Sequence, residues 1–194
     1  MSIHTIEPGF LLAAPRMGDP NFEGTVVLLG AHEEGGSLGW TVNGASLAEA
    51  ADIVHATGIV TAGEKLPAAF ERQALSGGPV SPESVWILYR RVTAAEPLPG
   101  SIVVGADIGV TSSMDALRTL LAGGGPREFR LLIGYAGWGP GQLEREISNG
   151  TWLPAAADAD LLFDGTPETL WQRAYARAIG SIPAAFVGTT RGSA

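Results

Sequence analysis

The chain has 194 residues, a net charge of −8, and 45% hydrophobic residues against 16% charged ones. This length suits one domain, and this balance favours a packed core over a disordered chain. The absence of cysteine excludes a disulfide, a thiolate nucleophile and any zinc or iron–sulfur site ligated by cysteine.

Short apolar runs predict that the chain begins with strands. Residues 9–14 predict a first strand, and residues 24–31 form a continuous apolar run typical of a buried strand. A polar loop over residues 32–36 leads to a further strand at 38–42. The two strands on either side of this loop are expected to pair as a hairpin.

The residues after this hairpin predict a helix. Ser46 stands where an N-cap is needed, and Leu47, Ala50 and Val54 recur at helical spacing. The helix is expected to end near Gly58, because glycine favours the conformation that terminates helices.

The remainder of the chain mixes strands and short helices in an irregular order. Strands are expected at 83–91, 102–104, 108–110, 129–136 and 152–153. Helices are expected at 114–121 after a cap at Ser112 or Ser113, at 142–147, and from Thr166-Pro167-Glu168 to about 178. This order predicts an α+β fold rather than a βαβ repeat. Residues 1–183 are expected to form one domain and residues 184–194 a mobile tail.

The charge pattern disfavours direct binding of nucleic acid. An acidic chain repels phosphate, and the only local concentrations of positive charge are Arg90-Arg91 and the Arg127/Arg130 pair. A basic patch could still assemble in three dimensions. The sequence shows neither a signal-peptide pattern nor an apolar run of membrane-spanning length, so a cytoplasmic protein without a membrane segment is expected.

Two motifs in the predicted hairpin loop invite a catalytic or metal-binding interpretation. Residues 35–39 match Gly-x-Ser-x-Gly, but that pattern marks a nucleophile only on a strand-to-helix turn, and here a strand follows Ser37. His32, Glu33 and Glu34 are three potential ligands, yet adjacent residues rarely converge on one ion. A solvated hairpin loop is favoured, and no metal or cofactor is expected.

Glycine-rich segments carry the other candidates. Gly77 and Gly78 would act through backbone N–H groups or would simply provide positive φ. The five tryptophans mostly stand in apolar surroundings typical of a core, and Trp138, among glycines, is the one of them most expected to be partly exposed. Glu144 and Glu146 are expected to answer the dipole of the helix that follows.

The chain resembles the AlgH/YqgE-like family of bacterial proteins, and the matching motifs run from Pro8 to about Ala174. These motifs are Gly9-Phe10-Leu11, Asp19-Pro20, the 32–35 loop, Val42-Asn43, Gly77-Gly78-Pro79-Val80, Gly134-Tyr135-Ala136-Gly137-Trp138, Gly141-Gln142-Leu143-Glu144, Trp152, Leu162-Phe163-Asp164 and Trp171. Two departures stand out: Asn43-Gly44-Ala45 replaces the family's usual Asn-Arg-Pro, and Ser37 replaces its usual alanine.

The resemblance implies a compact α+β domain with a small, barrel-like, branched and mostly antiparallel sheet flanked by short helices. Members are largely uncharacterised, and some are described as transcriptional regulators. The leading hypothesis is therefore a binding or regulatory protein that acts through a protein or small-molecule partner. The alternative is a small enzyme with a site around His32, Asn43 and Trp138. Under either hypothesis, the candidate surface consists of His32, Glu33, Asn43, Gly77, Gly78, Tyr135, Trp138 and Gln142.

Overall fold

The computed structural model describes residues 6–15, 23–61, 63–92 and 94–180, so the tail expected at 184–194 lies outside the described residues. The strands are β1 (Gly9–Ala13), β2 (Val26–Glu33), β3 (Gly36–Thr41), β4 (Ser46–Glu49), β5 (Gln73–Ser76), β6 (Val80–Arg90), β7 (Ile102–Val104), β8 (Ile108–Thr111), β9 (Phe129–Trp138) and β10 (Trp152–Ala155). The helices are α1 (Ala50–Ala56), α2 (Met114–Leu121), α3 (Gln142–Ser148), α4 (Ala159–Phe163) and α5 (Pro167–Gly180), with a 3₁₀ turn η1 (Ala68–Glu71).

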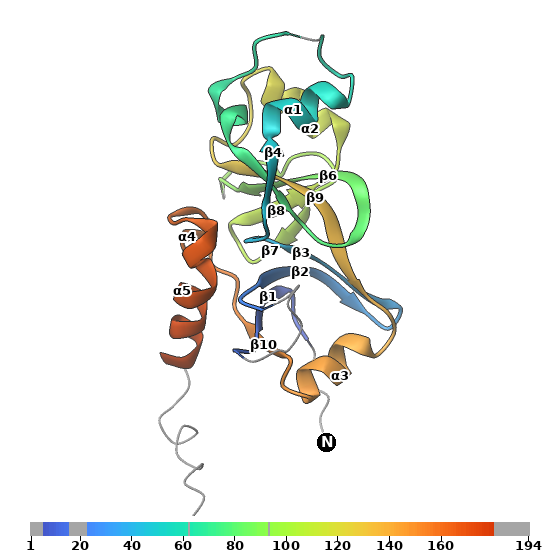
Figure 1. Ribbon diagram of the computed structural model, residues 1–194, viewed down its shortest axis with the longest axis vertical. Helices are drawn as coiled ribbons and strands as arrows, with labels where there is room; N and C mark the ends of the chain where they lie inside the picture. The colour runs from blue at the N-terminus through green and yellow to red at the C-terminus, as the bar shows by residue number, and fades with distance from the viewer. Residues whose placement is uncertain (1–5, 16–22, 62, 93, 181–194) are drawn as a thin grey trace, which may run out of the picture.

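The strands form one branched sheet in the order β10-β1-β2-β3-β9-β6-β8-β7 (Figure 1). All pairings along this path are antiparallel. The branch is β5, which runs parallel to β9 and pairs on its other side with β4. This confirms the predicted α+β fold with a branched, mostly antiparallel sheet.

The lower part of the sheet, which contains β10, β1, β2 and β3, is apolar on both faces. Along β1, Phe10 and Leu12 face the cluster that α4 and α5 cover, while Leu11 and Ala13 face the cluster covered by α3. Successive side chains of a strand point to opposite faces, so one short apolar strand supplies both cores. This explains why residues 9–14 and 24–31 read as continuous apolar runs rather than as alternating ones.

The upper part of the sheet, which contains β5, β6 and the first half of β9, has a separate core beneath α1 and α2. Val54 of α1 and Leu117 of α2 are buried in it, and the rings of Phe70 and Phe129 pack edge to face with centroids 5.1 Å apart. Strand β9 runs between the two parts, as Figure 1 shows, and contributes side chains to all three clusters.

Two backbone segments cross closely where β9 passes from the upper part to the lower part. A Cβ on Gly78 would collide with the Tyr135 carbonyl group, and one on Gly77 would collide with the Gly134 carbonyl oxygen. Gly77 donates its N–H to the Ile133 carbonyl (2.7 Å) and accepts the Thr41 N–H (2.8 Å). We call this contact between residues 77–78 and residues 133–135 the glycine crossing.

The structure corrects the predicted helix start and the predicted loop. Residues from Ser46 to Glu49 form strand β4, and α1 begins only at Ala50, with Glu49 as an N-cap that makes no side-chain hydrogen bond. Pairing with β5 overrides the local helical spacing. Strand β2 includes His32 and Glu33, so only Glu34 and Gly35 turn the hairpin.

Three short elements, β5, η1 and α4, have no counterpart in the sequence prediction. The predicted Ser113 cap is confirmed, since its hydroxyl accepts the Ala116 N–H. None of the helices among the described residues has both the length and the apolar character to cross a membrane.

Candidate functional site

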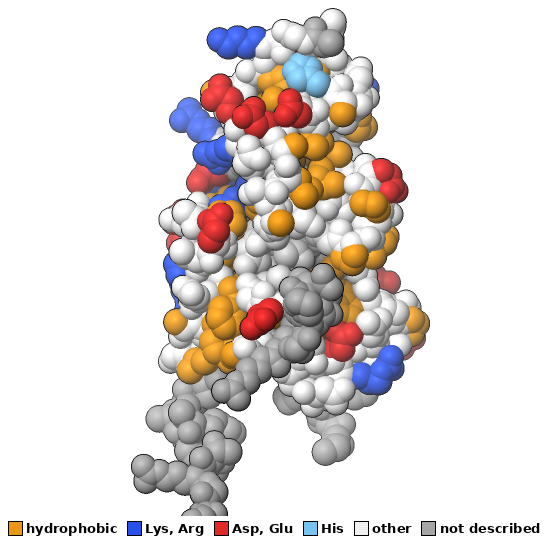
Figure 2. Space-filling view, in the orientation of Figure 1, with side chains coloured by type: hydrophobic (Ala, Val, Ile, Leu, Met, Phe, Trp, Pro, Cys, Tyr) orange, Lys and Arg blue, Asp and Glu red, His pale blue; other side chains and the backbone are white. Residues whose placement is uncertain are grey.

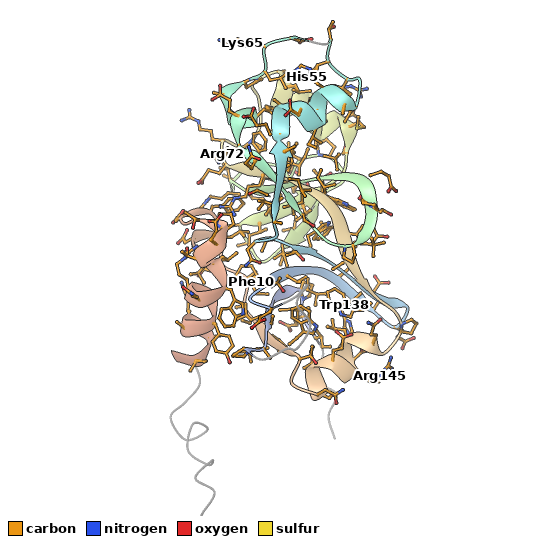
Figure 3. All side chains as sticks on the ribbon, viewed as in Figure 1. Phe10, His55, Lys65, Arg72, Trp138 and Arg145 are labelled. Carbon is orange, nitrogen blue, oxygen red and sulfur yellow. The ribbon has the colours of Figure 1, made fainter. Side chains whose placement is uncertain are left out.

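The eight predicted site residues separate into three places. His32, Glu33, Trp138 and Gln142 lie where the β2–β3 hairpin meets the end of β9 and the start of α3, the region labelled by Trp138 in Figure 3. Gly77, Gly78 and Tyr135 belong to the glycine crossing. Asn43 follows β3 beside the glycine crossing, where Thr41 donates its N–H to the Gly77 carbonyl, but its amide turns to Gly24 and Val26.

Glu146, a carboxylate outside the predicted candidate surface, organises the first of these places. One oxygen of Glu146 accepts the indole N–H of Trp138 (2.9 Å) and that of Trp152 (2.8 Å). Its other oxygen accepts from the Gln142 amide (2.9 Å), while the Gln142 oxygen accepts the Gly139 N–H (3.0 Å). We call Glu146 with Gln142, Trp138 and Trp152 the indole clamp, because it holds α3 against β9 and β10.

The indole clamp corrects two expectations. Trp138 is only 7% exposed rather than partly exposed, because its ring packs edge to face against Trp152 at 6.1 Å and its N–H is satisfied inside the clamp. Glu146 faces the two indoles, whereas Glu144 stands in the first turn of α3. The spacing of Gln142 and Glu146, one helical turn apart, was the available sequence signal.

His32 lies in a row of polar groups across the hairpin. Its Nδ1 is 2.8 Å from the Ser37 hydroxyl on the paired strand, and its Nε2 is 3.7 Å from a Glu144 oxygen. The order serine, histidine, carboxylate is that of a hydrolase triad. However, the contact to Glu144 is longer than a hydrogen bond, and Ser37 lies inside β3 rather than on a strand-to-helix turn.

Asn43 has a structural role that accounts for both ends of its amide. Its oxygen accepts the Val26 N–H (2.7 Å), and its nitrogen donates to the Gly24 carbonyl (2.9 Å). The side chain therefore fixes the residues that lead into β2. The enzyme site predicted around His32, Asn43 and Trp138 required the three to converge, and their hydrogen bonds place Asn43 in a different set of contacts.

The glycine crossing lies beside a chain of aromatic rings. Tyr135 packs edge to face on Trp86 (6.1 Å between centroids), and Trp86 in turn packs on Trp40 (5.0 Å). Trp40 is fully buried, whereas Trp86 is only partly buried. The aromatic chain therefore leads from the core to the surface.

At that surface, Trp86 lines a groove of about 310 Å³ between β6, α2 and the end of α1. Its apolar walls include Val85, Trp86, Met114 and Leu117, and Figure 2 shows hydrophobic side chains gathered between these elements. Polar groups from Glu83, Ser84 and Ser113 also line it. We call this feature the Trp86 groove. Met114 and Leu117 lie on one helix as predicted, but no local pattern in the sequence indicates that Met114 is 44% exposed.

A bulge in β6 shapes one wall of the Trp86 groove. Val80 and Val85 pair with Tyr135 and Ile133, so the residues between them loop out of the ladder. Ser81 has a positive φ of 47° in this loop. The Ser84 hydroxyl donates to the Ser81 carbonyl (2.8 Å) and accepts the indole N–H of Trp86 (3.1 Å), which fixes the ring at the groove.

Within the described residues, no group of three or more His, Asp or Glu side chains is placed to hold a metal ion. The carboxylates that do approach one another are engaged by arginine. Arg90 contacts Glu128 (2.7 Å), Asp160 (2.7 Å) and Asp164, and the hydrogen bond that Arg90 donates to Asp160 is the main reason that the pKa of Arg90 is raised.

These features define a class of protein: an α+β domain whose branched, curled sheet is closed by short helices. The AlgH-like family model matches residues 10–183, and the chain belongs to this family. Among its relatives, a UPF0301 protein of Anaeromyxobacter sp. (strain K) is 40% identical over 186 residues, covering 94% of this chain and 92% of that protein. A UPF0301 protein of Xanthomonas campestris pv. campestris (strain B100) is 39% identical over 167 residues, covering 86% of each chain.

Solved structures agree with this assignment. The solution structure of the AlgH protein from Pseudomonas aeruginosa matches with a TM-score of 0.74 and 30% identity, covering 100% of this chain and 98% of that one. The crystal structure of protein DIP2367 from Corynebacterium diphtheriae shares the fold, with a TM-score of 0.70 and 23% identity, covering 91% of this chain and 90% of that one.

The indole clamp predicts a large difference between two neighbouring carboxylates. Replacing Glu146 with alanine should lower the free energy of unfolding by about 2 to 4 kcal/mol, because two nearly buried indole N–H groups lose their acceptor. Replacing Glu144 with alanine should cost less than about 0.5 kcal/mol, because its side chain is 40% exposed. Urea denaturation of both variants measures the difference, and equal losses would contradict the clamp.

Proposed function

We propose that this protein works by binding a protein or small-molecule partner, with the Trp86 groove as the docking place. The groove carries the proposal because it combines apolar walls with a few fixed polar groups, as ligand sites usually do. The predicted candidates Asn43, Trp138 and Gln142 favour a binding protein over an enzyme, because their polar atoms are engaged in hydrogen bonds that hold the fold together. Two residues of the predicted surface lie behind the groove: Tyr135 packs on Trp86, and Gly78 lies against the backbone of Tyr135.

Any effect on transcription would then pass through the partner. The net charge of −8 disfavours close approach to a nucleic-acid duplex, whose affinity for proteins depends on neutralising phosphates. We also propose that the protein acts in the cytoplasm.

A charge placed in the Trp86 groove should abolish partner binding. Met114→Glu introduces a carboxylate beside Trp86 and Leu117, where an apolar group of a ligand would have to desolvate it. The matched control is Val103→Glu, which adds the same charge at an exposed position of β7. Tagged proteins are recovered from their native host, and mass spectrometry identifies the bound proteins and small molecules.

We expect at least one bound species that is retained by the wild type and by Val103→Glu and is lost from Met114→Glu. Equal recovery with Met114→Glu would contradict the groove as the docking place. Finding no bound species with the wild type would contradict the binding function itself.

The row of Ser37, His32 and Glu144 favours a hydrolase as the second candidate. If Glu144 keeps the proton on Nε2, then Nδ1 of His32 can accept the proton of Ser37 as its hydroxyl attacks an acyl carbon. This candidate ranks second because Ser37 is held within the hairpin ladder, between pairings with His32 and Trp138.

A fluorophosphonate probe separates the two candidates. We expect Ser37 to remain unlabelled, because its hydroxyl lies on a paired, half-buried strand rather than at the end of an exposed turn. Intact-mass measurement and peptide mapping detect the adduct. Labelling that disappears in both Ser37→Ala and His32→Gln would instead establish the hydrolase and displace the binding proposal.

A further inference from the structure

Two arginines converge on the connection between α4 and α5. Arg130, near the start of β9, donates from Nη2 to the Gly165 carbonyl (3.3 Å), and its guanidinium lies over the Phe163 ring at 5.6 Å. Arg173 of α5 packs against the same glycine, since a Cβ on Gly165 would lie 2.9 Å from its Nη1. Gly165 therefore permits two cationic groups to approach one another.

These guanidinium groups retain unused donors. Nη1 of Arg130 is buried, and no hydrogen-bond acceptor reaches it from the described part of the chain. Arg173 uses Nε on Thr169 (3.3 Å) and Nη2 on the Leu161 carbonyl (2.8 Å). A buried N–H without a partner loses its hydrogen bond to water without gaining another, so an acceptor at this place would be stabilising.

A third arginine, Arg72, adds to the positive charge. The pKa of Arg130 is lowered first by burial and then by the nearby positive charges of Arg72 and Arg173. Arg72 is exposed at the residue before β5, and Figure 3 shows it on the side of the molecule that carries α4 and α5. We call Arg72, Arg130 and Arg173 the arginine cluster.

The nearby carboxylates are already occupied. Glu128 pairs with Nε of Arg90 at 2.7 Å. Glu168 is fully exposed, and its pKa is lowered mainly by hydrogen bonds to its own backbone N–H and to Thr166 at the start of α5, with Arg130 as a smaller cause. Both raise the pKa of Arg130, yet the net effect on Arg130 remains a lowering.

We propose that the arginine cluster binds the phosphate group of a small, soluble ligand. Guanidinium groups offer paired N–H donors that match phosphate oxygens, and a phosphate among three of them would accept from the unused donors and relieve their repulsion. Because Nη1 of Arg130 is buried, the site suits a single small group rather than a flat polyanionic surface. The net charge of −8 argues against duplexes and anionic membranes in the same way. This site is separate from the Trp86 groove and does not depend on it.

Titration with inorganic phosphate and with pyrophosphate tests the site, with chloride at matched ionic strength as the reference. The readouts are the NMR signals of the Arg130 Nε–H and of the Gly165 and Thr166 amides. We expect saturable shifts with both phosphates and none with chloride. Arg72→Gln should weaken binding about five- to tenfold, as loss of one charged donor does. Arg118→Gln should not change it, since Arg118 lies on α2 and pairs with Asp115.

Three results would overturn the proposal: no saturable shift, equal shifts with chloride, or unchanged affinity in Arg72→Gln. Arg72 is exposed, so its variant should fold even if Arg130→Gln does not. Sedimentation with phosphatidylglycerol vesicles separates the possible phosphate sources. Binding to vesicles that requires Arg72, without a response to soluble phosphates, would assign the cluster to lipid headgroups and overturn a soluble ligand.

Discussion

Strand β9 changes partners along its length, and the rest of the molecule depends on how closely another segment can approach it there. Its first half pairs with β5 and β6, and its last residues pair with β3. At the exchange, residues 77–78 lie directly against the carbonyl groups of Gly134 and Tyr135, where any Cβ would collide. The glycine crossing thereby joins the α1–α2 half to the half that contains β1, β2 and α3.

The crossing also sets where functional surfaces can form. It places Tyr135 against Trp86 and so positions the ring that lines the Trp86 groove. Beyond it, β9 continues to Trp138, whose indole the clamp fixes through Glu146. At the opposite end of β9, Arg130 brings its charge to the α4–α5 connection. Strand β9 therefore supplies a residue to the indole clamp and to the arginine cluster, and its Tyr135 packs on the ring that lines the Trp86 groove.

The sequence predicted the secondary-structure elements better than the side-chain contacts between them. Continuous apolar runs and the Ser113 cap located most strands and α2, because those signals are local. The prediction that a helix begins at Ser46 was wrong, because pairing of β4 with β5 outweighs helical spacing. That pairing joins residues far apart in the chain. Glu146 was assigned to the helix dipole because no local pattern reveals that two distant tryptophans share its oxygen. Asn43 was a reasonable polar candidate whose backbone partners only the fold reveals.

Comparing Gly78→Ala with Gly58→Ala tests the crossing most directly. Both glycines have positive φ (146° and 72°), but a Cβ at Gly58 would meet no atom within 4 Å, whereas one at Gly78 would meet the Tyr135 backbone. Urea denaturation should show a loss of about 1 kcal/mol for Gly58→Ala and of about 3 kcal/mol or more for Gly78→Ala. Equal, small losses would show that the two backbones can separate freely and would contradict the central role of this contact.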